Sequence, residues 1–140
     1  MAPYLLNKEI KMFSNITDLT GRILLSVLFL SAGLSKLGAG YEGTAQYMAA
    51  MGISPALLPL VIATEILGAI AIIVGFQTRI TAFLLAGFSI LSAVFFHLDF
   101  ADQIQSILFM KNIAIAGGFL VLMSHGAKRF SIDAALAART

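Results

Sequence analysis

The 140-residue chain is long enough for one compact unit and too apolar for an ordinary soluble domain. Hydrophobic residues make up 59% of it and charged residues 11%, whereas soluble domains carry about 25% charged residues. The net charge is only +2 and there is no cysteine, which leaves nucleic-acid binding without support and excludes disulfides, thiol chemistry and cysteine-ligated metal clusters. A soluble protein of this size could not bury so much apolar side chain, so we expect an integral membrane protein.

Residues 1–19 are predicted to form a short N-terminal arm at the membrane surface. Lys8 and Lys11 lie next to apolar residues such as Ile10 and Phe13. Because the arm contains no apolar stretch followed by a small-residue cleavage site, we do not expect it to be a cleavable signal peptide.

Four apolar segments follow the arm and are predicted to be helices near residues 20–38, 57–76, 80–97 and 108–125. Each is close to the roughly 20 residues that a helix needs to cross a bilayer. Helices satisfy their own backbone hydrogen bonds in lipid, and four strands are too few for a closed barrel. The expected fold class is therefore all-α, a four-helix transmembrane bundle of up-down topology over residues 20–126.

The distribution of lysine and arginine predicts that both ends of the chain are cytoplasmic. With a cytoplasmic N-terminus, that side carries Lys8, Lys11, Arg22, Arg79, Lys128, Arg129 and Arg139. The other side carries only Lys36 and Lys111. By the positive-inside rule, the tail at residues 127–140 is then cytoplasmic, and the loops near 39–56 and 98–107 face outward. We expect the membrane to be the bacterial inner membrane.

Glu65 is the most informative polar residue within the apolar segments, where each charged group is costly. It lies about 12 Å along its predicted helix, too deep for its short side chain to reach water. Glu65 must therefore be protonated, paired or close to water. A structural ion pair that locks the bundle and a ligand or proton site both agree with this placement.

The first predicted helix carries one polar stripe with a positive charge at each end. Arg22, Ser26, Phe29, Gly33 and Lys36 recur at spacings of three and four residues, which places them on one helical face. Arg22 and Lys36 are candidate site residues, although two interfacial side chains that snorkel to water would give the same pattern.

The up-down topology places six polar residues in the outer half of the bilayer. They are Lys36, Glu65, His97, Asp99, Lys111 and Asn112. If their helices pack together, these groups converge on one polar site in which opposite charges compensate each other. His97 alone is also typical of an interfacial residue.

Several chemistries find no support in the sequence. His97 and His125 belong to opposite ends of the predicted bundle, and Lys36 and Lys111 would repel a cation, so no metal or haem is expected. No nucleophile–histidine–acid pattern and no phosphate loop is present, so no catalytic residue is assigned.

Three pieces of the chain, in order and at these spacings, resemble the DoxX family of small membrane proteins. The pieces are GRILLSVLFLSAGLSKL at 21–37, EILGAIAIIVGFQTR at 65–79 and KNIAIAGGFLVLMSHGAKRFSID at 111–133. The match covers most of residues 20–133. Family members often have Gly-Gly where this chain has Gly68-Ala69, a difference of one methyl group.

The resemblance implies a four-helix membrane fold and an association with redox systems. Some DoxX-like proteins are described as subunits of a thiosulfate:quinone oxidoreductase, and others as membrane partners of oxidative-stress enzymes. Positions that recur in the family correspond to Arg22, Lys36, Glu65, Lys111 and Asn112. We therefore expect a membrane subunit or partner of a redox enzyme, without catalytic activity alone, whose outer polar pocket binds a quinone-like or amphipathic small molecule.

Two other hypotheses stay open. A buried Glu65 with nearby lysines could couple proton movement to an anion in a small transporter or lipid-binding protein, and so small a transporter would need to be a homodimer. Alternatively, Lys128, Arg129 and the arm could recruit a soluble enzyme to the membrane, which would make the chain a structural partner.

Overall fold

The computed structural model describes residues 2–140, and this part of the chain is helical without any strand. Four long helices are α1 (Ala2–Ser35), α3 (Leu58–Val74), α4 (Thr78–Phe96) and α5 (Gln103–His125). The shorter elements are α2 (Ala39–Ala50), the 3-10 turn η1 (Pro55–Leu57) and α6 (Ile132–Ala137).

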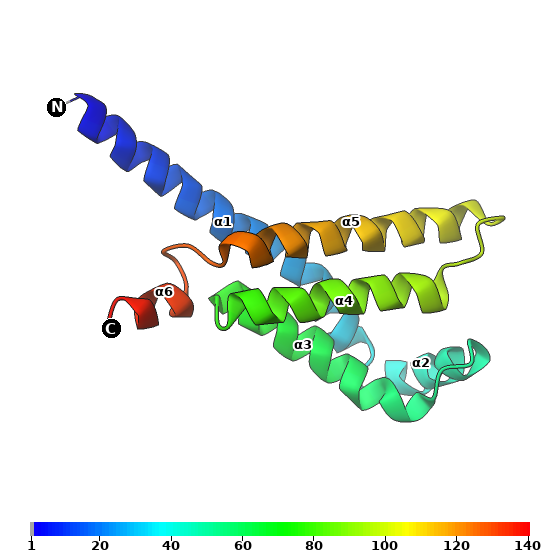
Figure 1. Ribbon diagram of the computed structural model, residues 1–140. Coiled ribbons are helices and arrows are strands. Elements are labelled where there is room, and N and C mark those ends of the chain that lie inside the picture. Colours follow the sequence, from blue (N-terminus) through cyan, green and yellow to red (C-terminus); the bar gives the residue numbers. More distant parts are fainter. Residues whose placement is uncertain (1) are drawn as a thin grey trace.

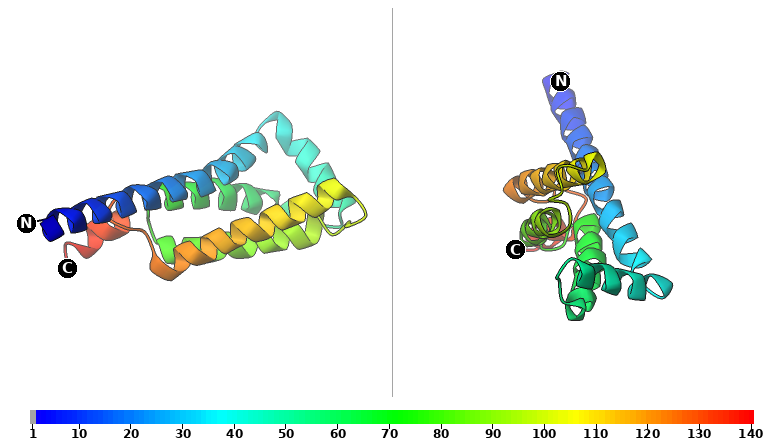
Figure 2. Two further views of the ribbon diagram at one scale, coloured as in Figure 1. Left: turned by 90° about the horizontal axis from the view of Figure 1, so that it is seen from above. Right: turned by 90° about the vertical axis from the view of Figure 1, so that its right-hand side faces the viewer.

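The four long helices, α3 together with η1, are each long and apolar enough to cross a membrane. They run alternately up and down as two packed pairs, α1 with α3 and α4 with α5, and the pairs meet where α3 contacts α4 (Figures 1 and 2). The prediction of an all-α, four-helix transmembrane bundle is thus confirmed.

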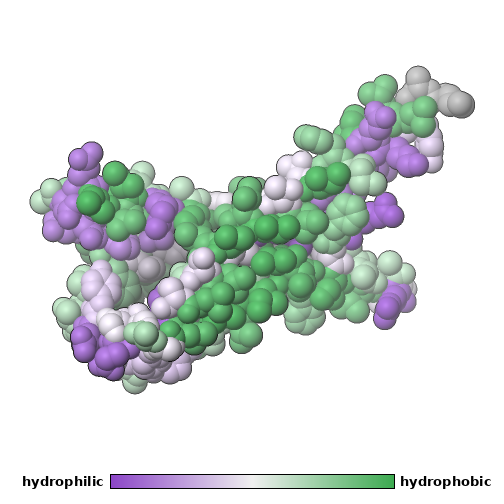
Figure 3. Space-filling model, turned by 180° about the vertical axis from the view of Figure 1, so that it is seen from behind, coloured by the Kyte–Doolittle hydropathy of each residue, from purple (hydrophilic) through white to green (hydrophobic). Residues whose placement is uncertain are grey.

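The core lies where the two pairs meet. Phe29 of α1 packs edge-on against Phe119 of α5, with ring centroids 5.4 Å apart. Small residues such as Ala69 and Ala82 are fully buried, which lets helices approach closely in lipid. Most other large apolar side chains point outward, and Figure 3 shows them covering the middle of one face, with hydrophilic residues toward both ends.

The helix boundaries differ from the sequence-based expectation at two places. The arm at residues 1–19 does not form a separate element, because from Ala2 onward it is the first part of α1. With 34 residues this helix is about 51 Å long, and its N-terminal part projects beyond the bundle (Figure 1). The expected loop near 39–56 instead contains α2 and η1.

Candidate functional site

An ion pair joins the end of α1 to the middle of α3. Lys36 Nζ lies 2.9 Å from Glu65 Oε1 and 2.8 Å from Oε2, and it also donates to the Ala32 carbonyl at 3.0 Å. Glu65 is 5% exposed. Gly33 makes this contact possible, since a Cβ there would lie 2.6 Å from the side chain of Ile66 and 3.1 Å from Glu65 Cβ.

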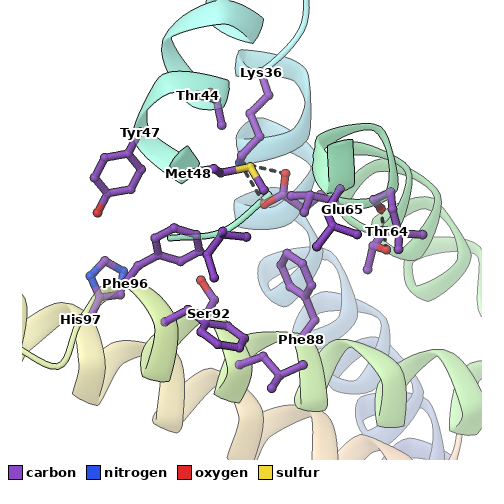
Figure 4. A pocket seen from close by; sticks show the side chains of 16 residues that line it. Lys36, Thr44, Tyr47, Met48, Thr64, Glu65, Phe88, Ser92, Phe96 and His97 are labelled. Atoms are coloured by element: carbon purple, nitrogen blue, oxygen red, sulfur yellow. Dashed lines mark hydrogen bonds and ion pairs between the residues drawn. The ribbon is translucent and has the colours of Figure 1, made fainter. Parts of the chain in front are cut away.

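The ion pair lies at one side of a cavity of about 370 Å³ between α2, α3 and α4. Figure 4 shows Lys36 and Glu65 on one side of it and Tyr47 and His97 on the other. The polar residues that line it are Lys36, Thr44, Tyr47, Thr64, Glu65, Ser92 and His97. The remaining lining residues are all apolar and include Phe88, Phe95 and Phe96. The cavity is therefore an apolar space with polar groups at opposite sides.

Several polar groups of the cavity already have partners within the protein. The hydroxyls of Thr44 and Thr64 donate to the carbonyls one turn before them in their helices, each at 2.8 Å. His97 Nδ1 lies 2.7 Å from Gln105 Oε1. The Tyr47 ring stacks on Phe96, with centroids 5.5 Å apart, so this contact connects α2 to the end of α4.

The structure brings some of the predicted site residues together and separates others. Lys36, Glu65 and His97 all line the cavity. Asp99 is exposed, and its Oδ1 accepts the N–H of Ala101 at 3.2 Å. Lys111 is exposed on α5 and Asn112 is partly buried there, and within residues 2–140 α5 contributes no lining residue. Glu65 is therefore paired with Lys36 rather than with Lys111.

Sequence reasoning missed four polar lining residues. Thr64 and Ser92 lie within apolar helices, where a hydroxyl group could have marked them in the sequence as candidate site residues. Thr44 and Tyr47 belong to α2, whose sequence AGYEGTAQYMAA is rich in small residues and offers little helical apolar periodicity. Because the sequence predicts a loop near residues 39–56, it did not indicate that side chains of this segment pack over α3 and α4.

Arg22 lies at the opposite end of the bundle, fully buried, and fastens three segments of the chain. Its Nε contacts Asp18 Oδ2 at 3.0 Å. One guanidinium nitrogen donates to the Ile72 and Ile73 carbonyls at 3.1 and 2.9 Å, and the other donates to the Phe130 carbonyl at 2.5 Å. A cation at the last carbonyls of α3 satisfies groups that a helix end leaves open.

Two further charged side chains secure the helix ends close to Arg22. Arg79 donates to the Met123 and Ser124 carbonyls at the end of α5, at 3.0 and 2.7 Å. Asp133 accepts the N–H groups of Gln77 and Thr78 at the start of α4, each at 2.8 Å. The Asp133 contacts hold the C-terminal segment against the bundle, and the Arg79 contacts join the start of α4 to the end of α5.

The surroundings of Asp133 favour its charged form. Burial opposes its ionisation, but the hydrogen bonds from the N–H groups of Thr78 and Gln77 and the charge of Arg22 outweigh this effect. Together they lower the pKa of Asp133 below its ordinary value. Arg22, Arg79 and Asp133 thus secure helix ends at this end of the bundle, away from the cavity at the α2 end.

Comparison with known proteins decides the family. Residues 17–98, more than half of the chain, match the family model DoxX. This chain belongs to the DoxX family. It is 48% identical over 123 residues to "Inner membrane protein YqjF" of Escherichia coli (strain K12), covering 88% of this chain and 94% of that protein. "Inner membrane protein YphA" of the same organism is 36% identical over 122 residues, covering 82% and 86%. No solved structure matches the chain.

The positions that the DoxX resemblance singled out lie at three separate places in this family member. Lys36 and Glu65 form the ion pair at the cavity, whereas Arg22 joins α1, α3 and the C-terminal segment at the other end of the bundle. Lys111 and Asn112 lie on α5, apart from both. Both Lys36–Glu65 and Arg22 adjoin a hollow, but the one beside Lys36 and Glu65 is the more enclosed, and we take it as the candidate ligand site.

Proposed function

We propose that this DoxX-family protein binds a quinone-like or similar amphipathic small molecule in the cavity between α2, α3 and α4, and that it serves as a membrane subunit or partner of a redox system. The observation that carries the proposal is the position of the Lys36–Glu65 ion pair at one side of an otherwise mostly apolar cavity. Small-molecule sites combine apolar walls with a few placed polar groups in this way.

The size and lining of the cavity support a ring-shaped head group. A volume of about 370 Å³ lies within the range of about 300–1,000 Å³ that is common for small-molecule sites. Phe88, Phe95 and Phe96 supply aromatic surface for a flat ring, since aromatic pairs gain energy beyond their buried area. Several apolar lining residues, such as Leu57 and Leu60, can contact the hydrocarbon part of an amphipathic ligand.

The proposal includes the membrane in which the protein lies and its orientation there. The relatives carry the name of inner membrane proteins, and we propose the same membrane here. The excess of lysine and arginine near the two chain ends supports a cytoplasmic location of both termini. In that orientation the cavity lies in the outer half of the bilayer, where an apolar quinone could enter laterally from lipid.

The proposed redox role assigns binding to this chain and electron transfer to a partner. The sequence has no cysteine, and residues 2–140 contain no group of three side chains suited to hold a metal ion. The family resemblance supports a partnership with a redox enzyme. In this arrangement the protein holds the lipid-soluble ring near the membrane surface, where a partner can reach it.

Native mass spectrometry of the gently purified protein, combined with solvent extraction, tests this proposal. We expect a small amphipathic molecule to remain bound and to be lost when Ser92→Phe fills the cavity. Leu120→Phe, on the exposed face of α5, adds the same ring outside the cavity and should keep the molecule. An empty wild-type protein that also takes up no added quinone would overturn the proposal, and a retained phospholipid instead of a ring compound would favour the lipid-binding alternative.

A further inference from the structure

At the ion-pair side of the cavity, the hydrogen-bond donors are used within the protein, whereas acceptors remain free for a ligand. A lysine ammonium has three N–H donors, and Lys36 directs its nitrogen at three acceptors, namely the Ala32 carbonyl and both oxygens of Glu65. The hydroxyls of Thr44 and Thr64 are likewise committed as donors to backbone carbonyls. The donors at this side are therefore already used.

The acceptors at the same side are not used up. An ionised carboxylate offers about four lone-pair sites, and among the described residues Glu65 accepts only the two bonds from Lys36. The hydroxyl oxygens of Thr44 and Thr64 also keep lone pairs. A ligand that meets this side of the cavity finds acceptors to donate to, but it must break a bond of the ion pair to find a donor.

The opposite side of the cavity offers a ligand both hydrogen-bond donors and acceptors. The hydroxyls of Tyr47 and Ser92 can each donate or accept, and His97 has a second ring nitrogen whose role follows the tautomer. In Figure 4, Tyr47, Phe96 and His97 lie together on the side of the cavity opposite Glu65. A ring with oxygen atoms at opposite ends can thus place one of them at either side.

We propose that the cavity selects ligands whose ring carries a hydroxyl that donates to Glu65, so that it binds a hydroquinone more tightly than the quinone of the same ring. This inference rests on the proposed function and names the chemical form of its ligand. The two forms share their size and apolar surface. A quinone has only carbonyl acceptors, and its oxygen would face the carboxylate oxygens of Glu65, whereas a hydroquinone has an O–H group there.

Anaerobic calorimetric titration of the detergent-solubilised protein with three matched ligands tests the selection. The ligands are a short-chain p-benzoquinone, its hydroquinone and the dimethyl ether of that hydroquinone. We expect the hydroquinone to bind at least about tenfold more tightly than the other two, which corresponds to about 1.4 kcal/mol. The ether separates the O–H donor from the electronic change of the ring, because it has the reduced ring without the donor.

The variant Glu65→Gln tests whether Glu65 causes the preference for the hydroquinone. The amide has both a donor and an acceptor, and the substitution frees Lys36 to donate, so we expect the affinity ratio to fall to within about twofold. Should this variant fail to fold, the comparison of the three ligands on the wild-type protein still decides the matter. Equal binding of quinone and hydroquinone, or an ether that binds as tightly as the hydroquinone, would overturn the inference and leave the proposed function standing. Binding of none of the three would overturn the proposed function itself.

Discussion

Lys36 Nζ lies 2.8 Å from Glu65 Oε2, and the two residues are 29 positions apart in the chain. This contact joins α1 to α3 at the cavity. The side chain of Glu65 is 7% exposed and that of Lys36 is 20% exposed, so the pair is shielded mainly on the carboxylate side. Its energetic role and its binding role can be separated by substitution.

Breaking the Lys36–Glu65 pair should destabilise the protein more than removing it. Lys36→Met leaves a buried carboxylate unpaired, and we expect a loss of about 2–3 kcal/mol, below the 3–5 kcal/mol typical of fully buried pairs because Lys36 is partly exposed. Lys36→Met combined with Glu65→Leu should recover most of this loss. Reversible unfolding in mixed micelles measures the cycle, and strictly additive losses would show that the two residues do not interact.

Removal of Arg22 should loosen the chain ends from the bundle. Arg22→Met strips the cation from Asp18 and from the carbonyls at the end of α3, at an expected cost of about 3–5 kcal/mol in the free energy of unfolding. Arg139→Met, at an exposed position near the C-terminus, is the matched control and should cost little. The same unfolding assay applies, and equal stabilities of the two variants would contradict the structural role of Arg22.

Gly75 should tolerate no side chain. Its φ is +68°, and a Cβ would lie 2.3 Å from Ser131 Cβ and 2.8 Å from the guanidinium of Arg22. Gly75→Ala therefore combines a backbone cost of about 1–2 kcal/mol with crowding. Gly52 has a φ of +76° with no atom within 4 Å of its Cβ position, so Gly52→Ala reports the backbone cost alone. Thermal unfolding of both variants should show the larger loss at Gly75, and equal losses would contradict the close packing there.

Acidification should weaken the docking of the C-terminal segment through Asp133. The pKa of Asp133 is lower in the folded protein than its ordinary value of 3.8, so its contribution is fully present above that value and is lost as the pH falls through the folded-state pKa. Asp133→Asn removes this titration. Between pH 6 and pH 3, the melting temperature of the wild-type protein should fall more steeply than that of the variant, whereas parallel curves would show that Asp133 does not contribute.

The sequence was sufficient to predict the fold and part of the candidate site. Long apolar segments fix the four helices, because a membrane leaves few alternatives. The cost of charge in lipid singled out Glu65 and Lys36, which the structure pairs. The sequence did not show how each helix is rotated about its axis, and therefore which of its polar residues face the cavity. Lys111 was one of six polar residues that would converge if their helices packed together, yet it is exposed on α5, since α5 packs on α4 and lies away from the cavity.

The remaining differences have physical causes as well. Arg22 can be interpreted as an interfacial snorkel from the sequence, because its acceptors are backbone carbonyls about 50 and 108 positions away. These distant carbonyls leave no sequence signal, although the Asp18–Arg22 pair, four residues apart on α1, could have been found from the sequence. The cavity wall supplied by α2 depends on the return of a small, weakly apolar helix over α3, which only tertiary contacts such as Tyr47 on Phe96 determine.

The most direct test of ligand binding between α2, α3 and α4 is photolabelling with a photoreactive benzoquinone, followed by mass-spectrometric mapping of the modified residues. We predict that labels concentrate on Lys36 and on residues 44–65 and 88–97. An excess of hydroquinone without the photoreactive group, present during irradiation, should prevent this labelling, and the outward face of α5 should stay unlabelled. Labels spread evenly over the lipid-facing helices and insensitive to competitor would contradict a specific site in this cavity.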